Sequence, residues 1–400
     1  MNTLKKAYCR VFQQAFHIAI PFLPYRKPKR LFHMEELAAL LEKKKISSVL
    51  LVTDSFIHSS GLTKNLEQEL ADKNIFCAIY DKTVANPTTD NVEEALQIYM
   101  ENDCGALIGF GGGSSIDCAK AVGARVANPN KSLARMEGIL KVVHKLPLLA
   151  AVPTTAGTGS ETTLAAVITD SETRHKYPIN DFPLIPRYAV LDPEVTRSLP
   201  PHLTATTGMD ALTHAVEAYI GHSTTVSTRK DAVLAVQLIF KYIRTAYNDG
   251  QNMTARKQML YAAYLAGNAF TRSYVGYVHA VAHSLGGKYN TPHGLANSVL
   301  LPFVLEAYGE TAEKPLHKLA VAVGISDKGE SDHEGAVKFI EAVKTMKKDM
   351  NIGDTIQGIK EEDIPELAKY AEREGNPLYP VPKLMDAKEL EQFYYMVMES

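Results

Sequence analysis

The segment HAVAHSLGGKYNTPHG (279–294) holds three histidines, of which the first two are four residues apart. A second segment, GMDALTHAVEAY (208–219), carries an aspartate and a histidine at the same spacing. Residues at positions i and i+4 lie on one face of a helix, one turn apart. Apolar residues recur at helical spacing in the second segment, and the Gly286-Gly287 pair predicts that the first helix ends just beyond its second histidine. Two helices could therefore bring a carboxylate and two or three imidazoles together, a set of ligands that suits a divalent transition metal.

The spacing alone leaves two other interpretations open. An aspartate and a histidine one turn apart can be an ordinary pair on a helix surface. A buried histidine can also be a core residue, or one that orients another side chain without binding metal. The rest of the sequence has to decide between them.

Length and composition exclude several classes of protein. The 400 residues suggest two domains with ample cores, and the 46% apolar and 22% charged residues are typical of globular proteins. The net charge of −2 gives no basic surface for nucleic acid. The four cysteines form no CxxC motif, which favours free thiols and a cytoplasmic location. Of these, Cys118 follows a glycine-rich turn and is expected to be a packed, inert thiol rather than a reactive one.

The N-terminus superficially resembles a signal peptide, because three basic residues precede VFQQAFHIAIPFLP (11–24). Gln13, Gln14 and His17 interrupt that apolar segment, and no small-x-small cleavage site follows it. We therefore expect mature protein that packs on the body of the molecule or on a partner subunit. No run approaches eighteen apolar residues, so neither a transmembrane helix nor a membrane partner is expected.

Strands and helices alternate in the first half of the chain. Short β-branched strands are predicted at SSVLLVT (47–53), IFCAIY (75–80) and GALIGF (105–110), with a helix at 62–73 and another capped by Asp90. The third strand runs directly into GGGSSIDCAKAVGARVA (111–127). A strand, a glycine turn and a helix form a cradle for phosphate, since the glycines admit close approach and the helix start offers free N–H groups. A merely flexible turn is the alternative.

A second polar turn and a change of periodicity complete the organisation. The buried strand LLAAV (148–152) leads into PTTAGTGSETT (153–163), whose hydroxyls and N–H groups suit a polar ligand, although a mobile surface loop fits as well. Beyond Leu199 the periodicity is helical almost throughout. The sequence therefore predicts an α/β domain (1–199) with a mostly parallel, nucleotide-binding sheet, followed by an all-helical, metal-binding domain (200–400). We expect the active site in a cleft between them.

Taken together, these motifs resemble those of the iron-containing (group III) alcohol dehydrogenases, which share the dehydroquinate-synthase-like fold. The resemblance covers nearly the whole chain and is weakest in the first forty residues. It rests on five motifs in order: GGGSSIDCAK (111–120), PTTAGTGSETT (153–163), GMDALTHAVEAY (208–219), HAVAHSLGGKYNTPHG (279–294) and GNPLYPVPKLMD (375–386).

The resemblance implies a metal site and a role for one further histidine. Its metal ligands would be Asp210, His214, His279 and His293, normally holding Fe2+ and in some members Zn2+. His283 matches the family's non-ligand histidine near the active site. Two roles stay open for it, a relay of protons toward solvent and the orientation of a metal ligand.

The resemblance also implies where a nicotinamide cofactor binds. The expected contacts are Asn86, Gly112, Gly113, Ser114, Thr154, Thr155, Thr158, Thr163 and Lys176. Asp54 ends the first strand of the α/β unit, where an acid can hydrogen-bond the ribose 2′-OH and repel a 2′-phosphate. This predicts NAD(H) rather than NADP(H), although a helix N-cap is an equally good use of Asp54.

The implied activity is the interconversion of an alcohol and an aldehyde or ketone by hydride transfer with NAD(H), with a metal that polarises the substrate oxygen. The partner is then a small-molecule alcohol or aldehyde, and a homodimer is the family-based expectation. Dehydroquinate synthase and glycerol dehydrogenase share the fold and use zinc. The first would need extra Lys and Arg for a phosphorylated acid, yet residues 279–294 contain only Lys288. A binding protein that has lost turnover is the remaining alternative, and the intact ligand set argues against it.

Overall fold

The computed structural model describes residues 1–399. The chain divides into two compact units, each of which is described by itself. Pro24–Ser198 form the α/β unit, and Met1–Leu23 together with Leu199–Ser400 form the helical unit. The boundary near Leu199 lies where the periodicity changes. The first 23 residues, in contrast, group with the helical unit rather than with the α/β domain to which the sequence-based boundaries assigned them.

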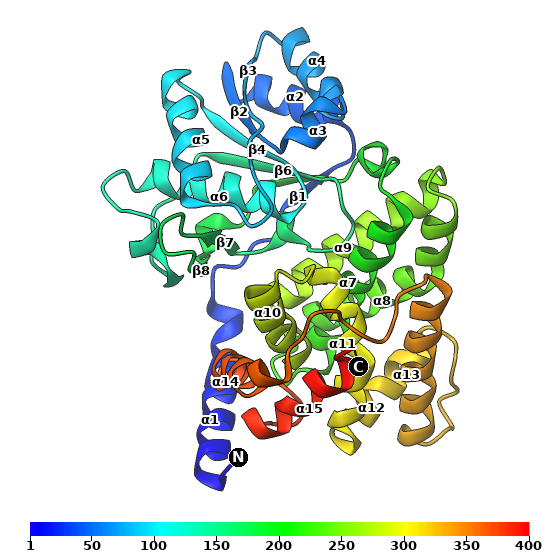
Figure 1. Ribbon diagram of the computed structural model, residues 1–400. Coiled ribbons are helices and arrows are strands. Elements are labelled where there is room, and N and C mark those ends of the chain that lie inside the picture. Colours follow the sequence, from blue (N-terminus) through cyan, green and yellow to red (C-terminus); the bar gives the residue numbers. More distant parts are fainter. Residues whose placement is uncertain (400) are drawn as a thin grey trace. The chain divides into compact units, whose positions relative to one another are not determined.

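A parallel sheet organises the α/β unit (Figure 1). Within residues 1–399 its strands run in the order β1-β9-β6-β4-β2-β3, and every pairing is parallel. The bounds are β1 Lys29–Leu31, β2 Ser48–Val52, β3 Phe76–Tyr80, β4 Ala106–Gly111, β6 Leu148–Pro153 and β9 Tyr188–Val190. β2 and β4 are buried at every position, as expected for strands covered on both faces.

Helices cover both faces of this sheet, and each face has its own core. Alternate residues of a strand point to opposite faces. Leu50 and Val52 accordingly join one apolar cluster, and Val49 and Leu51 join the other. The first cluster includes side chains of α5 (Thr89–Glu101) and α6 (Gly113–Ala127), and the second includes α2 (Met34–Lys43) and α4 (Lys64–Asp72). A short helix α3 (Ser55–Ser59) follows β2, and a small sheet of order β5-β8-β7 (Gly138–Ile139, Lys176–Asn180, Ala165–Thr169) completes the described part of the unit.

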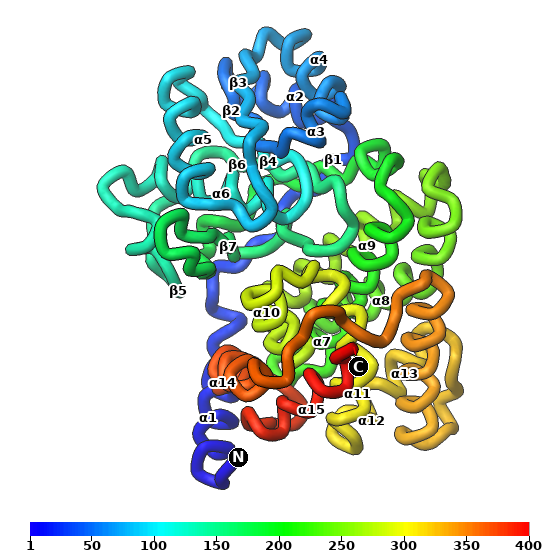
Figure 2. Tube along the Cα trace, viewed as in Figure 1, coloured from blue at the N-terminus to red at the C-terminus, as the bar shows by residue number. Residues whose placement is uncertain are grey.

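The helical unit contains α1 and all helices beyond Ser198 (Figures 1 and 2). None of its described residues belongs to a named strand; Ile356 and Met398 form an isolated bridge. The helices are α1 Thr3–Ala19, α7 Pro201–Ile220, α8 Val226–Asn248, α9 Met253–Ser273, α10 Tyr277–Tyr289, α11 His293–Tyr308, α12 Glu310–Ala322, α13 Asp332–Asp349, α14 Ile364–Gly375 and α15 Ala387–Val397. α7 is the central helix, since nearly all of its residues from Thr204 onward are buried.

Two local predictions were wrong. α5 is capped by Thr88, not Asp90, because Thr88 and Asn91 form a reciprocal capping box in which each side chain accepts the other residue's backbone N–H. α10 does not end at Gly286-Gly287 but continues to Tyr289 and closes at Asn290, which has a left-handed φ of 55°. Asparagine tolerates that conformation, so it takes over the role that glycine often has at a helix end.

No described helix is long and apolar enough to cross a bilayer.

Candidate metal centre and nucleotide-binding turns

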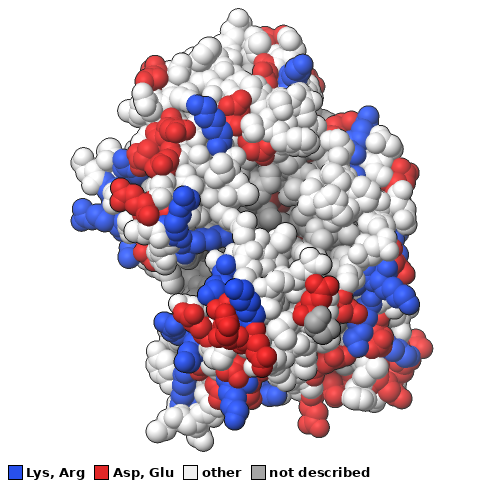
Figure 3. All heavy atoms as spheres, in the orientation of Figure 1, with Lys and Arg blue, Asp and Glu red and all other residues white. Residues whose placement is uncertain are grey.

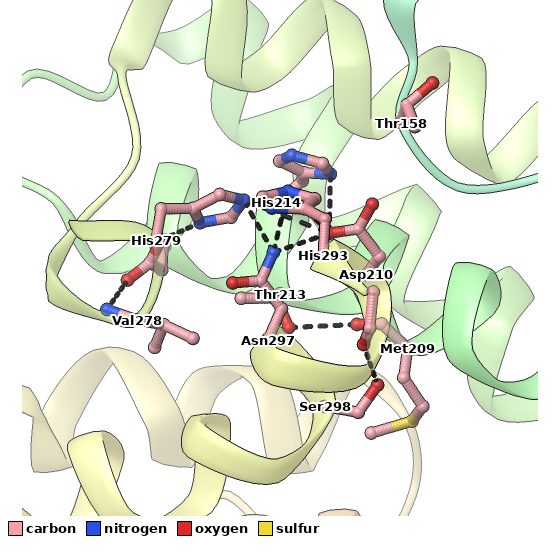
Figure 4. A network of polar contacts seen from close by, with 12 residues as sticks. Thr158, Met209, Asp210, Thr213, His214, Val278, His279, His293, Asn297 and Ser298 are labelled. Atoms are coloured by element: carbon pink, nitrogen blue, oxygen red, sulfur yellow. Dashed lines mark hydrogen bonds and ion pairs between the residues drawn. The ribbon is translucent and has the colours of Figure 1, made fainter. Parts of the chain in front are cut away.

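Three helices bring the four predicted metal ligands together. Asp210 and His214 lie on α7, His279 lies on α10, and His293 is the first residue of α11. One donor atom from each residue lies within 4.8 Å of all the others. Figure 4 shows these side chains turned toward one another. The pair at 210 and 214 contributes both of its residues to this cluster, whereas the pair at 279 and 283 contributes only His279.

The donor set fits a divalent cation. Asp210 Oδ1 is 3.9 Å from His214 Nδ1, 4.0 Å from His279 Nε2 and 3.5 Å from His293 Nε2. Ligands about 2.1 Å from one metal ion are roughly 3–4 Å from each other. Within the described residues, the ion-pairing groups within 4.0 Å of Asp210 are these histidines, and the carboxylate is only 1% exposed. A buried carboxylate without a fixed cation is costly, which is a physical reason for a metal here.

The buried Glu217, which the sequence-based prediction missed, sets the hydrogen-bonding state of His279. Its carboxylate accepts the backbone N–H groups of Gly276 and Val278 and lies 2.6 Å from His279 Nδ1. An ionised Glu217 places the proton of His279 on Nδ1, which leaves the Nε2 lone pair facing Asp210. Without a bound cation, burial raises the pKa of Glu217 to about 8, and burial and neighbouring histidines hold the pKa of His279 well below its usual range. A cation at the cluster would favour the ionised form of Glu217.

Position 276 has to be glycine for this contact. A Cβ atom there would stand 2.7 Å from Glu217 Oε1. The helix register could have revealed Glu217, because positions 210, 214 and 217 share one face of α7.

A second missed residue, Asn297, lies one turn beyond His293 on α11. Its side-chain nitrogen is 2.7 Å from Asp210 Oδ1, 3.1 Å from His279 Nε2 and 3.0 Å from His293 Nε2. An amide nitrogen carries two hydrogens, so it cannot satisfy three acceptors at once. The acceptor lone pairs around this nitrogen therefore outnumber its hydrogens, and a cation would satisfy the remaining ones. Figure 4 shows Asn297 beside Asp210, His279 and His293.

His283 lies beside this cluster without being one of its four donors. Its ring stacks on that of His293 with centroids 5.2 Å apart, and its Nδ1 is 2.6 Å from Glu374 Oε1. Tyr379 donates its hydroxyl to the same carboxylate oxygen. The His283 side chain is 42% exposed, so it connects the edge of the cluster with solvent. No local sequence pattern pointed to Glu374, which is 91 residues away.

The predicted cofactor turns lie at the carboxyl ends of β4 and β6 in the α/β unit. Gly112 caps α6, and a Cβ added at Gly113 would stand 3.2 Å from the Thr158 side chain. Thr155 borders Gly112 at 3.9 Å by the same measure, and the N–H of Thr154 donates to the carbonyl of Gly111. The two turns therefore form one surface.

The remaining predicted cofactor contacts lie at that surface or beneath it. Lys176 donates to Asn86 Oδ1 at 2.6 Å, and the N–H of Asn86 points to Ser114 Oγ at 3.4 Å. Asp54 caps α3 by accepting the N–H of Ile57, so the capping alternative is realised. The Thr163 hydroxyl is buried and bound to Lys120, a fully buried lysine whose ammonium also donates to Ser160 and to the carbonyl of Ala165.

Cys118, in contrast, is inert as predicted. It is fully buried, and burial raises the pKa of its thiol to about 12.

Comparison with known proteins identifies the class. Residues 31–193 match the family model "Iron-containing alcohol dehydrogenase", and residues 204–398 match "Fe-containing alcohol dehydrogenase family, C-terminal". This chain belongs to the iron-containing alcohol dehydrogenase family, which confirms the predicted family, fold class and enzyme class.

Relatives and solved structures agree. The chain is 37% identical to the NAD-dependent methanol dehydrogenase of Bacillus methanolicus over 340 residues, covering 84% of this chain and 89% of that protein. It is 37% identical to the 1,3-propanediol dehydrogenase of Klebsiella pneumoniae over 365 residues, or 90% and 93% of the two chains. The crystal structure of a 1,3-propanediol oxidoreductase matches with a TM-score of 0.89 and 34% identity, covering 93% and 98%.

Proposed function

We propose that this protein interconverts a short-chain alcohol or diol and its aldehyde with NAD(H), using Fe2+ held by Asp210, His214, His279 and His293. The observation that carries the proposal is the convergence of these four donors within 4.8 Å in a chain of this family. Zn2+ is the alternative metal, because these ligand types alone do not select between the two. The substrate class follows from the names of the relatives, a methanol and a propanediol dehydrogenase.

The metal would supply Lewis acidity toward a substrate oxygen, and NAD(H) would accept or donate the hydride. The residues of this chain contribute orientation and proton handling. Glu217 holds His279 with its lone pair inward, and Asn297 hydrogen-bonds Asp210. His283 takes up the alcohol proton and passes it to Glu374 at the solvent edge, which the 2.6 Å contact between them favours.

The cofactor belongs in the α/β unit. Support comes from the joined turns at Gly112 and Thr154 and from the NAD-dependent relative. Asp54 favours NAD(H), because its charge repels a 2′-phosphate while its cap bond keeps the carboxylate in place. We further propose a cytoplasmic homodimer.

The test is His279→Ala, with the exposed His333→Ala as the matched control. Purified wild type should contain about one metal ion per chain and reduce NAD+ with a short-chain alcohol. His279→Ala should lose most of its metal and its turnover, because one ligand of four is gone, while His333→Ala should behave as wild type. The assay compares NAD+ with NADP+ and includes metal analysis for iron and zinc.

Three outcomes would contradict the proposal. Undiminished metal and turnover in His279→Ala would remove the ligand assignment. Equal or better kcat/KM with NADP+ would reduce Asp54 to a helix cap. Metal binding without turnover on primary alcohols, diols or aldehydes would leave a binding protein or an enzyme of another class on the same fold.

A further inference from the structure

The N-terminal helix α1 packs on the protein through a mixed face, on which polar side chains lie beside the buried Cys9 and Ile20. Arg10 donates to the carbonyls of Val381 and Pro382, both at 2.7 Å, and Gln13 donates to the carbonyls of Pro377 and Tyr379. Gln13 is only 4% exposed. Figures 1 and 2 show α1 lying along α14, consistent with the Lys5–Glu372 ion pair. The docking of α1 therefore combines these hydrogen bonds with a few apolar contacts, such as that of Phe16 with Tyr274.

The apolar side chains of α1 face outward. Leu4 is 84% exposed, Tyr8 60%, Val11 69% and Ile18 61%, and Phe22 in the following 3-10 turn is 86% exposed. The lower-left margin of Figure 3, where Figure 1 places α1, shows uncharged atoms beside a strip of Lys and Arg atoms. A contiguous exposed apolar stripe of this kind usually marks an interaction surface.

The spacing within this stripe is that of a helix that pairs with another helix. With Ala15 included, its members are residues 4, 8, 11, 15, 18 and 22, which alternate steps of four and three. Apolar residues spaced in this way keep one seam of a helix facing a partner. We call these six residues the α1 stripe.

The α1 stripe is complementary to itself when reversed. When two copies of the helix lie antiparallel and centred on residue 13, position 4 of one copy faces position 22 of the other. Position 8 then faces 18, and position 11 faces 15, so each member of the stripe meets another member. Each pair joins a larger side chain to a smaller one: Phe22 to Leu4, Tyr8 to Ile18, and Val11 to Ala15. Packing large against small across an interface avoids both clashes and holes.

We propose that the α1 stripe is a self-association surface, on which a second copy of this chain lays its own α1 antiparallel about a two-fold axis. A two-fold interface uses the same patch on both subunits, which this symmetry permits. With roughly 150–200 Å² for a fully exposed large apolar side chain, the stripe offers about 600 Å² per copy, near the ~800 Å² per partner of a standard interface.

The charges favour a second copy over an anionic lipid surface. Residues 1–34 contain no acid, and α1 carries the basic side chains Lys5, Lys6 and Arg10, of which two are engaged. Lys5 pairs with Glu372, and Arg10 is bound to backbone carbonyls. Little positive charge is thus left to attract lipid headgroups. In the antiparallel arrangement each Lys5 faces the uncharged end of the partner's helix, so like charges stay apart.

The α1 stripe lies outside the segments that the family models match. The matched family models begin at residue 31 and therefore do not include α1. The inference does not depend on the catalytic proposal, because the stripe contains no site residue.

The first experiment measures the mass in solution by light scattering of the full-length wild type and of Val11→Glu/Ile18→Glu. Both side chains point to solvent, so the variant should fold, and each buried glutamate would oppose pairing. We expect the mass to halve to that of one chain while turnover per site is unchanged. Phe56→Glu is the matched control, an apolar side chain 76% exposed on α3, and it should keep the wild-type mass.

The second experiment tests the register by disulfide formation under mild oxidation. Val11→Cys/Ala15→Cys should give a covalent dimer, because these positions face each other, whereas Leu4→Cys/Ala15→Cys should not. A dimer that survives Val11→Glu/Ile18→Glu, or equal crosslinking of both cysteine pairs, would overturn the inference even if a homodimer forms elsewhere. Binding to anionic vesicles that the same double glutamate abolishes would overturn it in favour of a lipid surface.

Discussion

Glu217 shows how much one side chain outside a ligand set can contribute. It anchors the start of α10 through two backbone N–H groups and fixes the proton of His279. We expect Glu217→Gln to weaken metal binding by roughly 10–100-fold, because a neutral amide is a weaker acceptor for His279 Nδ1 and its NH2 group would face one of the N–H groups that the carboxylate now accepts. Metal titration of the metal-free protein measures this independently of activity. Glu374→Gln is the matched control and should keep wild-type affinity. Unchanged affinity in Glu217→Gln would leave Glu217 as a helix anchor only.

His283 permits a separate test of proton transfer. If it carries the substrate proton, His283→Ala keeps its metal, since the four donors remain, and turnover falls by ~10²–10⁴-fold. The loss should be larger for alcohol oxidation at lower pH, where solvent base is scarce. Measuring bound metal and the pH–rate profile on one preparation of the variant distinguishes proton transfer from the orientation of a metal ligand. A fall in metal affinity would instead make His283 an orienting residue, and an unchanged profile with full metal would exclude both roles.

At the scale of single residues, the convergence of the four predicted ligands followed from the shared helix face of Asp210 and His214 and from the motifs that surround all four. Asn297 lies four residues from His293 and Glu217 lies three residues from His214, so both were accessible in principle. Glu374 was not, since its contact with His283 spans 91 residues. The preference of Asp54 also could not be fixed, because one carboxylate at a strand end serves a helix cap and a ribose equally well.

His317 of α12 contacts Asp332 of α13 and should make the free energy of unfolding depend on pH. Its Nδ1 is 3.0 Å from Asp332 Oδ1 and its Nε2 is 3.0 Å from the carbonyl of Asp327. Because both nitrogens face acceptors, the doubly protonated ring is favoured, and these hydrogen bonds raise the pKa of His317. A raised pKa stabilises the fold fully below the unfolded value of about 6.5. That contribution is lost as pH rises through the folded pKa.

We therefore expect His317→Gln to lower the free energy of unfolding more at pH 5.5 than at pH 8.5. Chemical denaturation at the two pH values gives this difference. Asp332→Asn removes the main cause of the shift and should reduce the pH dependence in the same direction. An equal loss of unfolding free energy at both pH values would mean that His317 acts through packing. Its ring lies so close to Gly335 that a Cβ atom there would clash with it.

Elements were easier to predict than their ends. The buried strands and apolar helices follow from periodicity, which many residues carry jointly. The start of α5 and the end of α10 each depend on a single residue, Thr88 and Asn290. In both places a nearby residue, Asp90 or Gly286, was an equally good candidate from the sequence.

For the whole molecule, we expect that loss of a metal ligand in the helical unit leaves NADH binding by the α/β unit intact. The apolar clusters of the sheet are built from residues 34–195 alone, so the α/β unit has its own core. We expect His279→Ala to bind NADH within about twofold of wild type, because the predicted cofactor contacts all belong to the α/β unit and substitutions that share no partners add to within ~0.5 kcal/mol. Fluorescence titration with NADH is the measurement. A large loss of NADH affinity together with the metal would mean that the two sites are coupled.

The hydrogen bonds of α1 also constrain the order of events on the ribosome. Arg10 and Gln13 reach carbonyls 364 to 372 residues further along the chain. At roughly 5–20 residues per second, those carbonyls emerge about half a minute after α1 does. The α/β unit, whose residues end at 198, is fully synthesised well before then. α1 therefore docks only after the α/β unit has been synthesised, and until then a nascent chain offers the α1 stripe to chaperones and to its neighbours on the same message.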